Sequence, residues 1–332
     1  MENAANGGFQ GGNLAKYNVI VSGTSLFSWR FLSRPLVIFQ RQCQVNKLST
    51  PSRSPFAPFF SIGVMVNVAR TQGSPSIWGG IGGDLMVFVV QNIAGSLLNE
   101  FPSLPKNITD ANSAKKVAGY LLNKSIGSLF ASPFYASSVI HSIQSHVDGE
   151  GPPSVLECIQ DGFGQLFGYT YHSPHHLPLY VTTPAFVLHS LLHDVIQSAS
   201  TSLYRKLFPV PNHDDPDVNA VDFFHSQIMA TFFASSLSSA IMYPIETVLH
   251  RLIVQGTQTI IDNTETGMDF IPVHTNYQGF IDCAYTIVNE EGWLGFYKGF
   301  SAVILQILLG VAIAQTSKIV LGYFDTSEKR EQ

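Results

Sequence analysis

The chain has 332 residues, of which 45% are hydrophobic and only 12% are charged, and its formal net charge is −5. Charged residues make up about a quarter of an ordinary soluble domain, so this composition cannot cover a soluble surface and predicts an integral membrane protein. The acidic balance excludes a nucleic-acid partner, because no basic stripe is present to meet phosphates. The three cysteines lie far apart and indicate neither a disulfide framework nor a zinc motif.

The predicted order begins with a short tail over residues 1–14, continues with one domain over 15–325 and ends with a tail over 326–332. The first residues have no apolar signal core and no early arginine, so neither a secretory signal nor a cleaved mitochondrial presequence is expected. Within the domain, six apolar segments reach the length of about 20 residues that a bilayer requires. These segments are 15–42, 80–99, 114–144, 176–205, 222–254 and 300–322.

Longer linkers follow the first, third and fifth of these segments and carry short amphipathic stretches. In the last linker Phe280, Ala284, Ile287 and Val288 recur at helical spacing, which predicts a helix lying along the membrane surface. The order of helix, surface helix and helix therefore occurs three times. The predicted repeats cover about residues 15–105, 106–210 and 211–325.

Three prolines support this repeat. Pro35, Pro133 and Pro244 each lie near the end of an odd-numbered segment, and each is followed by a related tail: QGSPSIWGG, DGFGQLFGY and EGWLGFYKG. Each tail begins with an acidic or amide residue and a glycine and reaches an aromatic residue. Proline removes a hydrogen bond inside a helix, so three prolines in register predict shared kinks.

This pattern resembles the mitochondrial carrier family, solute carrier family 25, whose repeats carry P-x-[DE]-x-x-[KR]-x-[KR] and later [DE]-G-x-x-x-x-[WYF]-[KR]-G. The third repeat matches at Pro244, Glu246, Arg251, Glu291, Gly292, Tyr297, Lys298 and Gly299. The stretch YPIETVLHRLIVQG is most similar to a divergent branch of the family in the mitochondrial outer membrane. The resemblance implies an all-α membrane protein with six tilted transmembrane helices in three pseudo-repeated pairs.

The resemblance also implies gates, in which an acid of one odd helix pairs with a base of another. The acidic gate positions hold Val37, Tyr135 and Glu246, and the basic ones hold Gln40, Ser138 and Leu249. No pair keeps opposite charges, and only Glu246 against Gln40 remains a polar contact. The even segments contain no Lys or Arg over 80–99, 176–204 and 300–317, so a buried anion would lack a partner. These departures argue against anion transport.

Glu246 needs a partner if it lies within the bilayer, where a carboxylate costs about 2.5–3.5 kcal/mol on insertion scales. We expect it to face the interior and to contact Gln40, or His250 at i+4. A solvated position in the headgroup zone is the alternative. Gly79 and Gly83 have a small-xxx-small spacing that permits close helix approach, either within the chain or at a dimer seam.

The histidines do not form a recognised metal motif. His189 and His193 stand at i and i+4, but no glutamate lies between them as in H-E-x-x-H, so polar packing or proton-sensitive hydrogen bonding is favoured over metal binding. His172, His175 and His176 are interpreted in the same way. We therefore predict no catalytic, cofactor or metal site and no enzymatic activity.

The residues alone indicate only a loss of transport machinery. The resemblance to the outer-membrane branch implies a multi-pass, non-transporting scaffold in mitochondrial dynamics, with effects on fission and lipid supply. It implies contact with fusion GTPases, the cristae-organising complex and endoplasmic-reticulum contact proteins. Two alternatives stay open: a carrier for a neutral or cationic solute, and a protein insertase with an open groove.

Overall fold

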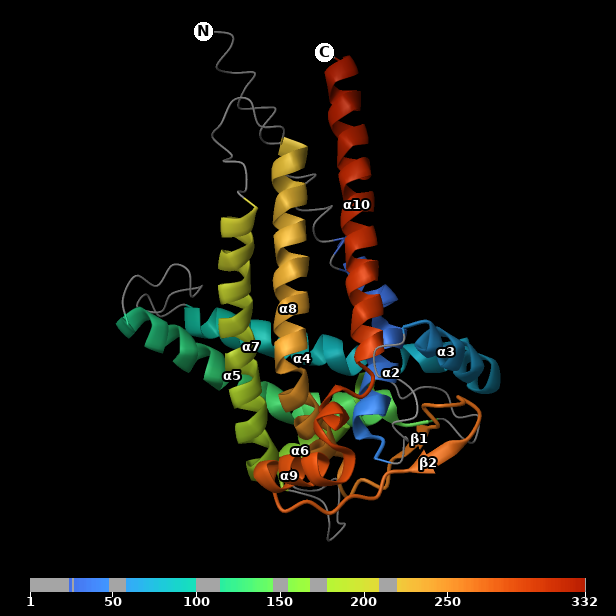
Figure 1. Cartoon of the computed structure of the whole chain (residues 1–332). Coiled ribbons are helices and arrows are strands. Elements are labelled where there is room, and N and C mark those ends of the chain that lie inside the picture. Colours follow the sequence, from blue (N-terminus) through green and yellow to red (C-terminus); the bar gives the residue numbers. More distant parts are fainter. Residues whose placement is uncertain are drawn as a thin grey trace. The chain divides into compact units, whose positions relative to one another are not determined.

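The computed structural model describes residues 24–25, 27–47, 58–99, 114–145, 155–167, 178–208 and 220–331. The predicted tail over 1–14 and the start of the first predicted segment lie outside them. The α-helices (Figure 1) are α2 (Arg34–Val45), α3 (Pro58–Gln72), α4 (Ile81–Asn99), α5 (Ala114–Ile143), α6 (Val155–Leu166), α7 (Leu179–Leu207), α8 (Ala220–Val254), α9 (Phe280–Glu291) and α10 (Phe300–Glu331). Two short 3-10 helices, η1 (Ser74–Trp78) and η3 (Trp293–Tyr297), precede α4 and α10.

Four helical stretches in the described residues are long and apolar enough to cross a membrane. They are Ser76–Ala94, Leu179–Leu207, Val221–Val254 and Trp293–Val320, which correspond to the second, fourth, fifth and sixth predicted segments. The third predicted segment is helical as α5, but its lysines and repeated serines lower its apolar content. Of the first predicted segment, the structure describes residues 24–25 and 27–42, which are helical except for a turn at Ser33 and include most of α2.

The proline of the first repeat occupies a different position in its helix from the prolines of the second and third repeats. Pro133 and Pro244 lie inside α5 and α8, as the kink prediction requires. The described chain instead turns at Ser33, and α2 begins at Arg34, so Pro35 lies in the first helical turn. Proline is tolerated there because the first N–H groups of a helix have no intrahelical partner.

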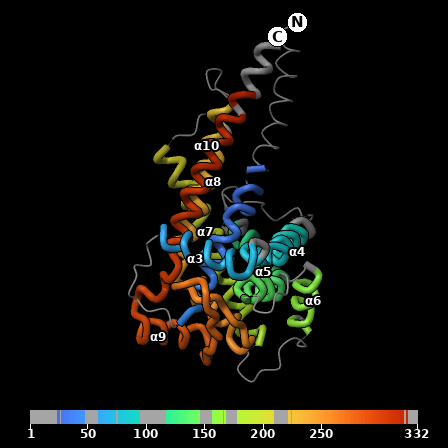
Figure 2. Tube along the Cα trace, turned by 90° about the vertical axis from the view of Figure 1, so that its right-hand side faces the viewer, coloured from blue at the N-terminus to red at the C-terminus, as the bar shows by residue number. Residues whose placement is uncertain are grey.

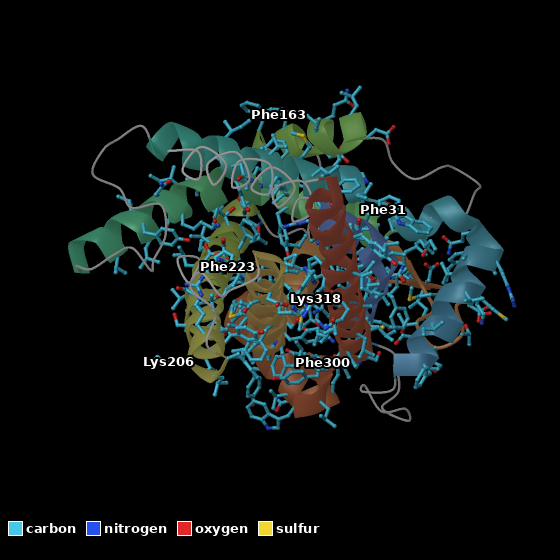
Figure 3. All side chains as sticks on the ribbon, turned by 90° about the horizontal axis from the view of Figure 1, so that it is seen from above. Phe31, Phe163, Lys206, Phe223, Phe300 and Lys318 are labelled. Carbon is cyan, nitrogen blue, oxygen red and sulfur yellow. The ribbon has the colours of Figure 1, made fainter. Side chains whose placement is uncertain are left out.

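The chain divides into two compact units. The smaller unit contains Met1–Ser33, Gln197–Ser238 and Leu305–Gln332, and the larger unit contains Arg34–Ile196 and Ser239–Ile304. In the smaller unit, Trp29 packs edge-on against Phe232 of α8 with ring centroids 5.7 Å apart. Lys318 extends from α10 (Figure 3), and its Nζ lies 3.0 Å from Oδ1 of Asp222 on α8.

The core of the larger unit joins α2, α5, α8 and the segment after α8. Its buried members include Val45, Val139, Ile143, Leu249 and Val254. Helices α4 and α5 lie side by side in this unit (Figures 1 and 2). The ring of Phe163 of α6 (Figure 3) stands edge-on to Phe134 of α5, with centroids 5.3 Å apart.

Helix α9 has the predicted amphipathic packing. Cys283 and Ile287 are buried, and Phe280, Ala284 and Val288 pack partly against the same cluster as Tyr277 and Phe296. A helical spacing of apolar residues therefore located this element correctly from the sequence.

The chain is mostly helical, as predicted, but the larger unit also contains a short β-hairpin that was not predicted from the sequence. Strand β1 (Ile260–Asp262) pairs antiparallel with β2 (Phe270–Pro272), with Ile261 opposite Ile271. The β-branched and aromatic residues of IID and FIP favour extended backbone, and Gly267 takes a positive φ of 67° in the connecting turn. The result is a short hairpin after α8 (Figure 1).

The first and third tails share one backbone geometry. Gly73 and Gly292 both have positive φ, 89° and 75°, and each is followed by a 3-10 helix. Gly80 and Gly299, seven residues further on, again have positive φ, 68° and 80°. The second tail differs, because Gly162 lies inside α6.

Gly83 brings α4 into close contact with α5 and α6. A Cβ atom at this position would lie 2.8 Å from the Cβ of Ser138 and 2.7 Å from the Sγ of Cys158. The close approach is therefore made within the chain.

We predict that Gly83→Ala lowers the free energy of unfolding by about 1–3 kcal/mol, because the added methyl group overpacks the contact between the helices. The matched control is Gly63→Ala on the exposed side of α3, where no atom lies within 4 Å of the added Cβ. This control should be neutral or stabilising by up to about 1 kcal/mol, because alanine favours helix. Thermal unfolding of both purified variants in detergent measures the difference, and equal melting temperatures would contradict the packing.

Candidate functional site

The C-terminal halves of α2, α5 and α8 meet in the larger unit and enclose a set of polar side chains that are buried or, for Tyr135 and Glu246, partly buried. We call this set the helix-end network: Gln40, Gln42, Gln44, Tyr135, Glu246, His250 and Arg251. Gln44 and His250 have no exposed surface, and Arg251 is 1% exposed. Polar groups removed from water in this way require internal partners, so their contacts define what this region can do.

Glu246 lies two residues after Pro244 on α8 and faces α2. The Nε2 of Gln40 lies 3.4 Å from each carboxylate oxygen and donates to them. The Nε2 of His250, one turn further along α8, stands 4.0 Å from Oε1 of Glu246. The structure thus brings together the three residues that the sequence selected for this contact.

His250 is fixed by two other partners. Its Nδ1 lies 2.6 Å from Oε1 of Gln44, and its Nε2 lies 2.8 Å from the hydroxyl of Tyr135. An amide oxygen only accepts hydrogen bonds, so Nδ1 of His250 donates to Gln44. Complete burial of the ring disfavours a second proton, so Nε2 accepts from Tyr135. The neutral imidazole therefore links α2, α5 and α8.

Arg251 makes the ionic contact of the third repeat. Its Nη2 donates to Oε2 of Glu291 at 2.9 Å, its Nη1 donates to the other carboxylate oxygen, and its Nε donates to the carbonyl of Gln44 at 2.8 Å. The Nζ of Lys298 lies 2.7 Å from the same carboxylate. A two-pronged arginine contact of this kind combines charge with fixed geometry.

The charges around Glu291 determine its protonation. Burial by itself would raise the pKa of this carboxyl group, but the bonds and charges of Arg251 and Lys298 outweigh burial and hold the pKa below its ordinary value. Glu291 at the end of α9 therefore remains ionised, and it ties α9 to the end of α8.

Different partners hold the start of the tail in the other two repeats. In the second repeat, Nε2 of His141 lies 2.7 Å from Oδ2 of Asp161. In the first repeat, the amides of Gln42 and Gln72 both donate to Asp262 of β1, with Gln42 at 2.8 Å. Each proline-bearing repeat therefore fastens its tail with a different set of side chains.

A second buried ionic cluster was not predicted from the sequence. Asp84 of α4 pairs with Arg34 and with Arg41, whose Nη2 lies 3.3 Å from Oδ1, and it accepts a bond from the hydroxyl of Ser138. Arg41 also donates to Ser142 on α5 at 2.9 Å. The available signal was one acid in the apolar segment 80–99 and two arginines seven residues apart, which lie on one helix face.

No metal site is found in the part of the chain that the structure describes, because no group of three or more His, Cys, Asp or Glu side chains is placed to hold an ion. The rings of His189 and His193 stand 6.1 Å apart on α7. His172, His175 and His176 lie outside the described residues.

The chain matches a sequence model of the family described as mitochondrial carrier protein, over residues 221–321. It is 39% identical over 306 residues to "Mitochondrial outer membrane protein SLC25A46" of Homo sapiens, covering 89% of this chain and 72% of the relative. It is 37% identical over 307 residues to the protein of the same name in Gallus gallus, covering 89% and 74%. It is 36% identical over 333 residues to "Solute carrier family 25 member 46-B" of Xenopus laevis, covering 96% and 78%.

The chain therefore belongs to the mitochondrial carrier family, in the divergent branch of these relatives. The names of these relatives and the four membrane-spanning stretches of the described residues assign it to the mitochondrial outer membrane as a multi-pass protein.

We predict that Glu291→Gln lowers the free energy of unfolding by about 3–5 kcal/mol, because it leaves the buried guanidinium of Arg251 without its counter-charge. The matched control is the neighbouring substitution Glu290→Gln. Glu290 pairs with Lys47 at the surface, where both side chains are more than 40% exposed, so this change should cost at most about 1 kcal/mol. Unfolding in detergent measures both variants, and equal costs would contradict the buried pair.

The buried pair of Glu291 and Arg251 also makes the stability of the protein depend on pH. A carboxyl group with a lowered pKa stabilises the fold above its unfolded pKa of about 4.3 and loses that contribution as the pH falls through its folded pKa. The difference between wild type and Glu291→Gln should therefore be constant near neutrality and shrink below about pH 4.

We predict that Glu246→Lys reduces the amount of folded protein in the membrane, because it replaces the acceptor of the Gln40 amide with a cation that has no counter-charge, at a cost of about 3 kcal/mol or more. Glu246→Gln preserves an acceptor for Gln40 and should accumulate almost normally. Quantitative blotting of membrane fractions compares the two variants with wild type. Normal amounts of the lysine variant would place Glu246 in the solvated headgroup zone.

Proposed function

We propose that this protein is a non-transporting scaffold of the mitochondrial outer membrane that acts by contact in mitochondrial dynamics. One observation carries the proposal: the carboxylates of Asp84, Glu246 and Glu291 each receive hydrogen bonds from side chains of the protein itself. Carboxylates whose oxygens already accept hydrogen bonds from the protein are not available to hold a solute, and Asp84 and Glu291 are in addition matched by arginine.

Alternating access requires gate contacts that break on one side as others form. At the gate positions of this chain, Glu246 accepts hydrogen bonds from the neutral amide of Gln40, and Tyr135 bonds to His250. The positive side chains near them are engaged, because Arg34 and Arg41 bind Asp84, the carbonyl of Gly79 and Ser142. An anionic substrate would have to displace Asp84 from these arginines, at the cost of an unpaired buried carboxylate.

We infer that the fold is the six-helix bundle of the family, in three pseudo-repeated pairs over 15–105, 106–210 and 211–325. The family match over 221–321 supports the third repeat. The shared geometry of the first and third tails, with positive φ at Gly73 and Gly292 and again at Gly80 and Gly299, supports a common origin of those two repeats.

As a scaffold, the protein would influence the balance of fission and fusion, cristae organisation and lipid supply. The partners that follow from the family resemblance are fusion GTPases, the cristae-organising complex and endoplasmic-reticulum contact proteins, together with the lipid bilayer. The proposal includes no cofactor and no enzymatic step.

The proposal predicts that depletion changes mitochondrial shape before metabolite levels. We expect elongated or hyperconnected networks, and rescue by the wild-type protein detected at the outer membrane. Glu246→Gln should rescue shape as well as wild type does, because a scaffold needs the fold and not a titrating carboxylate. Live imaging with a matrix marker, at matched expression levels, measures network length.

A transport assay with the purified protein in liposomes tests the proposal against the carrier alternative. Counter-exchange of nucleotides, carboxylates, amino acids or inorganic ions should not rise above that of empty vesicles. Saturable exchange of one solute class, together with normal mitochondrial shape after depletion, would refute the scaffold and support a carrier.

A further inference from the structure

The segment from Thr259 to Val273, which we call the strap, covers the ends of the three proline-bearing helices. It contains β1 and β2, follows α8 directly and lies beside the C-terminal end of α2 (Figure 1). No position of the strap belongs to the family motif. Its contacts therefore need an explanation of their own.

The inner face of the strap is part of the hydrophobic core. Ile261 has no exposed surface and Val273 is 8% exposed, and both belong to the cluster that contains Val45, Ile143 and Val254. These three residues lie at the ends of α2, α5 and α8. The strap thus buries apolar surface against all three helices at once.

Polar contacts join the strap to helices of the other two repeats. The carbonyl of Ile260 accepts from the backbone N–H of Ser145 just after α5, at 2.8 Å. Thr264 accepts from the side chain of Asn46 just after α2, also at 2.8 Å. The carbonyl of Thr266 accepts from Asn67 on α3 at 2.9 Å.

Asp262 supplies a charge that the first repeat lacks. The third repeat has Glu291 at the start of its tail and the second has Asp161, whereas the first has the neutral Gln72. Asp262 is 4% exposed, and its two oxygens accept from Gln72 and from Gln42 of α2. The Nε2 of Gln42 also donates to the carbonyl of Ile143 on α5, at 3.2 Å.

We propose that the strap is a built-in clamp that holds the ends of α2, α5 and α8 together, with Asp262 as its positioning residue. The carboxylate of Asp262, which belongs to the third repeat, takes the place of the acid that the first repeat lacks. It is also linked to the second repeat, because Gln42 donates both to Asp262 and to the carbonyl of Ile143. The clamp fixes this end of the larger unit in the closed arrangement. It does not depend on a role in mitochondrial dynamics, and its test involves neither mitochondrial shape nor transport.

Cys43 provides a native reporter of the clamp. It lies on α2 between Gln42 and Asn46, both of which bind the strap, and it is 8% exposed. Cys158 and Cys283 are also buried thiols, on α6 and α9. The full-length protein in lipid nanodiscs would be pulsed with a maleimide, and peptide mass spectrometry would give the labelling rate of each cysteine separately.

Asp262→Asn should raise the labelling rate of Cys43 at least about tenfold, the factor expected when a charge-assisted hydrogen bond is lost. The rate of Cys158 should change by less than about twofold, because its thiol packs against Ser137 of α5 and Gly83 of α4, away from a local opening at the strap. Asp269→Asn, on the exposed part of the same hairpin, is the matched control and should label like wild type.

Gln72→Glu alone should also open the clamp, because it sets two carboxylates against each other. The double variant Gln72→Glu with Asp262→Asn moves the single carboxylate to the other side of the contact. Because the effects of substitutions at contacting residues are not additive, Cys43 labelling should return to within about threefold of wild type. Three results would overturn the proposal: unchanged Cys43 labelling in Asp262→Asn, an equal rise at Cys43 and Cys158, or a double variant that labels as fast as Asp262→Asn.

Discussion

Arg251 imposes the strongest constraint on this structure, because a guanidinium that is 1% exposed must be matched inside the protein. Glu291 supplies two bonds and the carbonyl of Gln44 a third. The ends of α8, α9 and α2 therefore meet at one side chain, and Lys298, just after η3, joins them through Glu291. The rest of the helix-end network is built around this junction, and each of its members is oriented by a partner on another helix.

The same region shows how the chain departs from the carrier pattern. Where the family resemblance implies charged gates, Tyr135 and Gln44 hold a neutral His250 between three helices. The ionic contacts of this region lie outside these gate positions, at Asp84 with Arg34 and Arg41 and at Glu291 with Arg251 and Lys298. Neutral hydrogen bonds have a low net energy but are expensive to leave unmade when buried. A network of this kind stabilises one arrangement of the helix ends. Its gate positions, all of which lie within the described residues, contain no ion pair that a bound substrate could break.

Local patterns in the sequence located the elements that local forces determine. Apolar length identified the four membrane-spanning stretches of the described residues among its six predicted segments, and the spacing of Phe280 and Ile287 identified α9. The contact of Glu246 with Gln40 was expected because a carboxylate in an apolar helix needs a partner. The strap and the Asp84 cluster were missed for the opposite reason. Asp262 binds partners that are 190 and 220 residues away, and Asp84 binds an arginine 50 residues away, so no periodicity or short motif records these contacts.

The central claim is that internal contacts hold the ends of α2, α5 and α8 in one arrangement. The most direct measurement is the distance distribution between spin labels at Lys47 and Gln144, two exposed positions just after α2 and α5, in lipid nanodiscs. The account predicts a single narrow distribution that does not change when nucleotides, carboxylates or amino acids are added. A second, longer distance that grows with one of these solutes would show that the helix ends separate, and it would contradict the account.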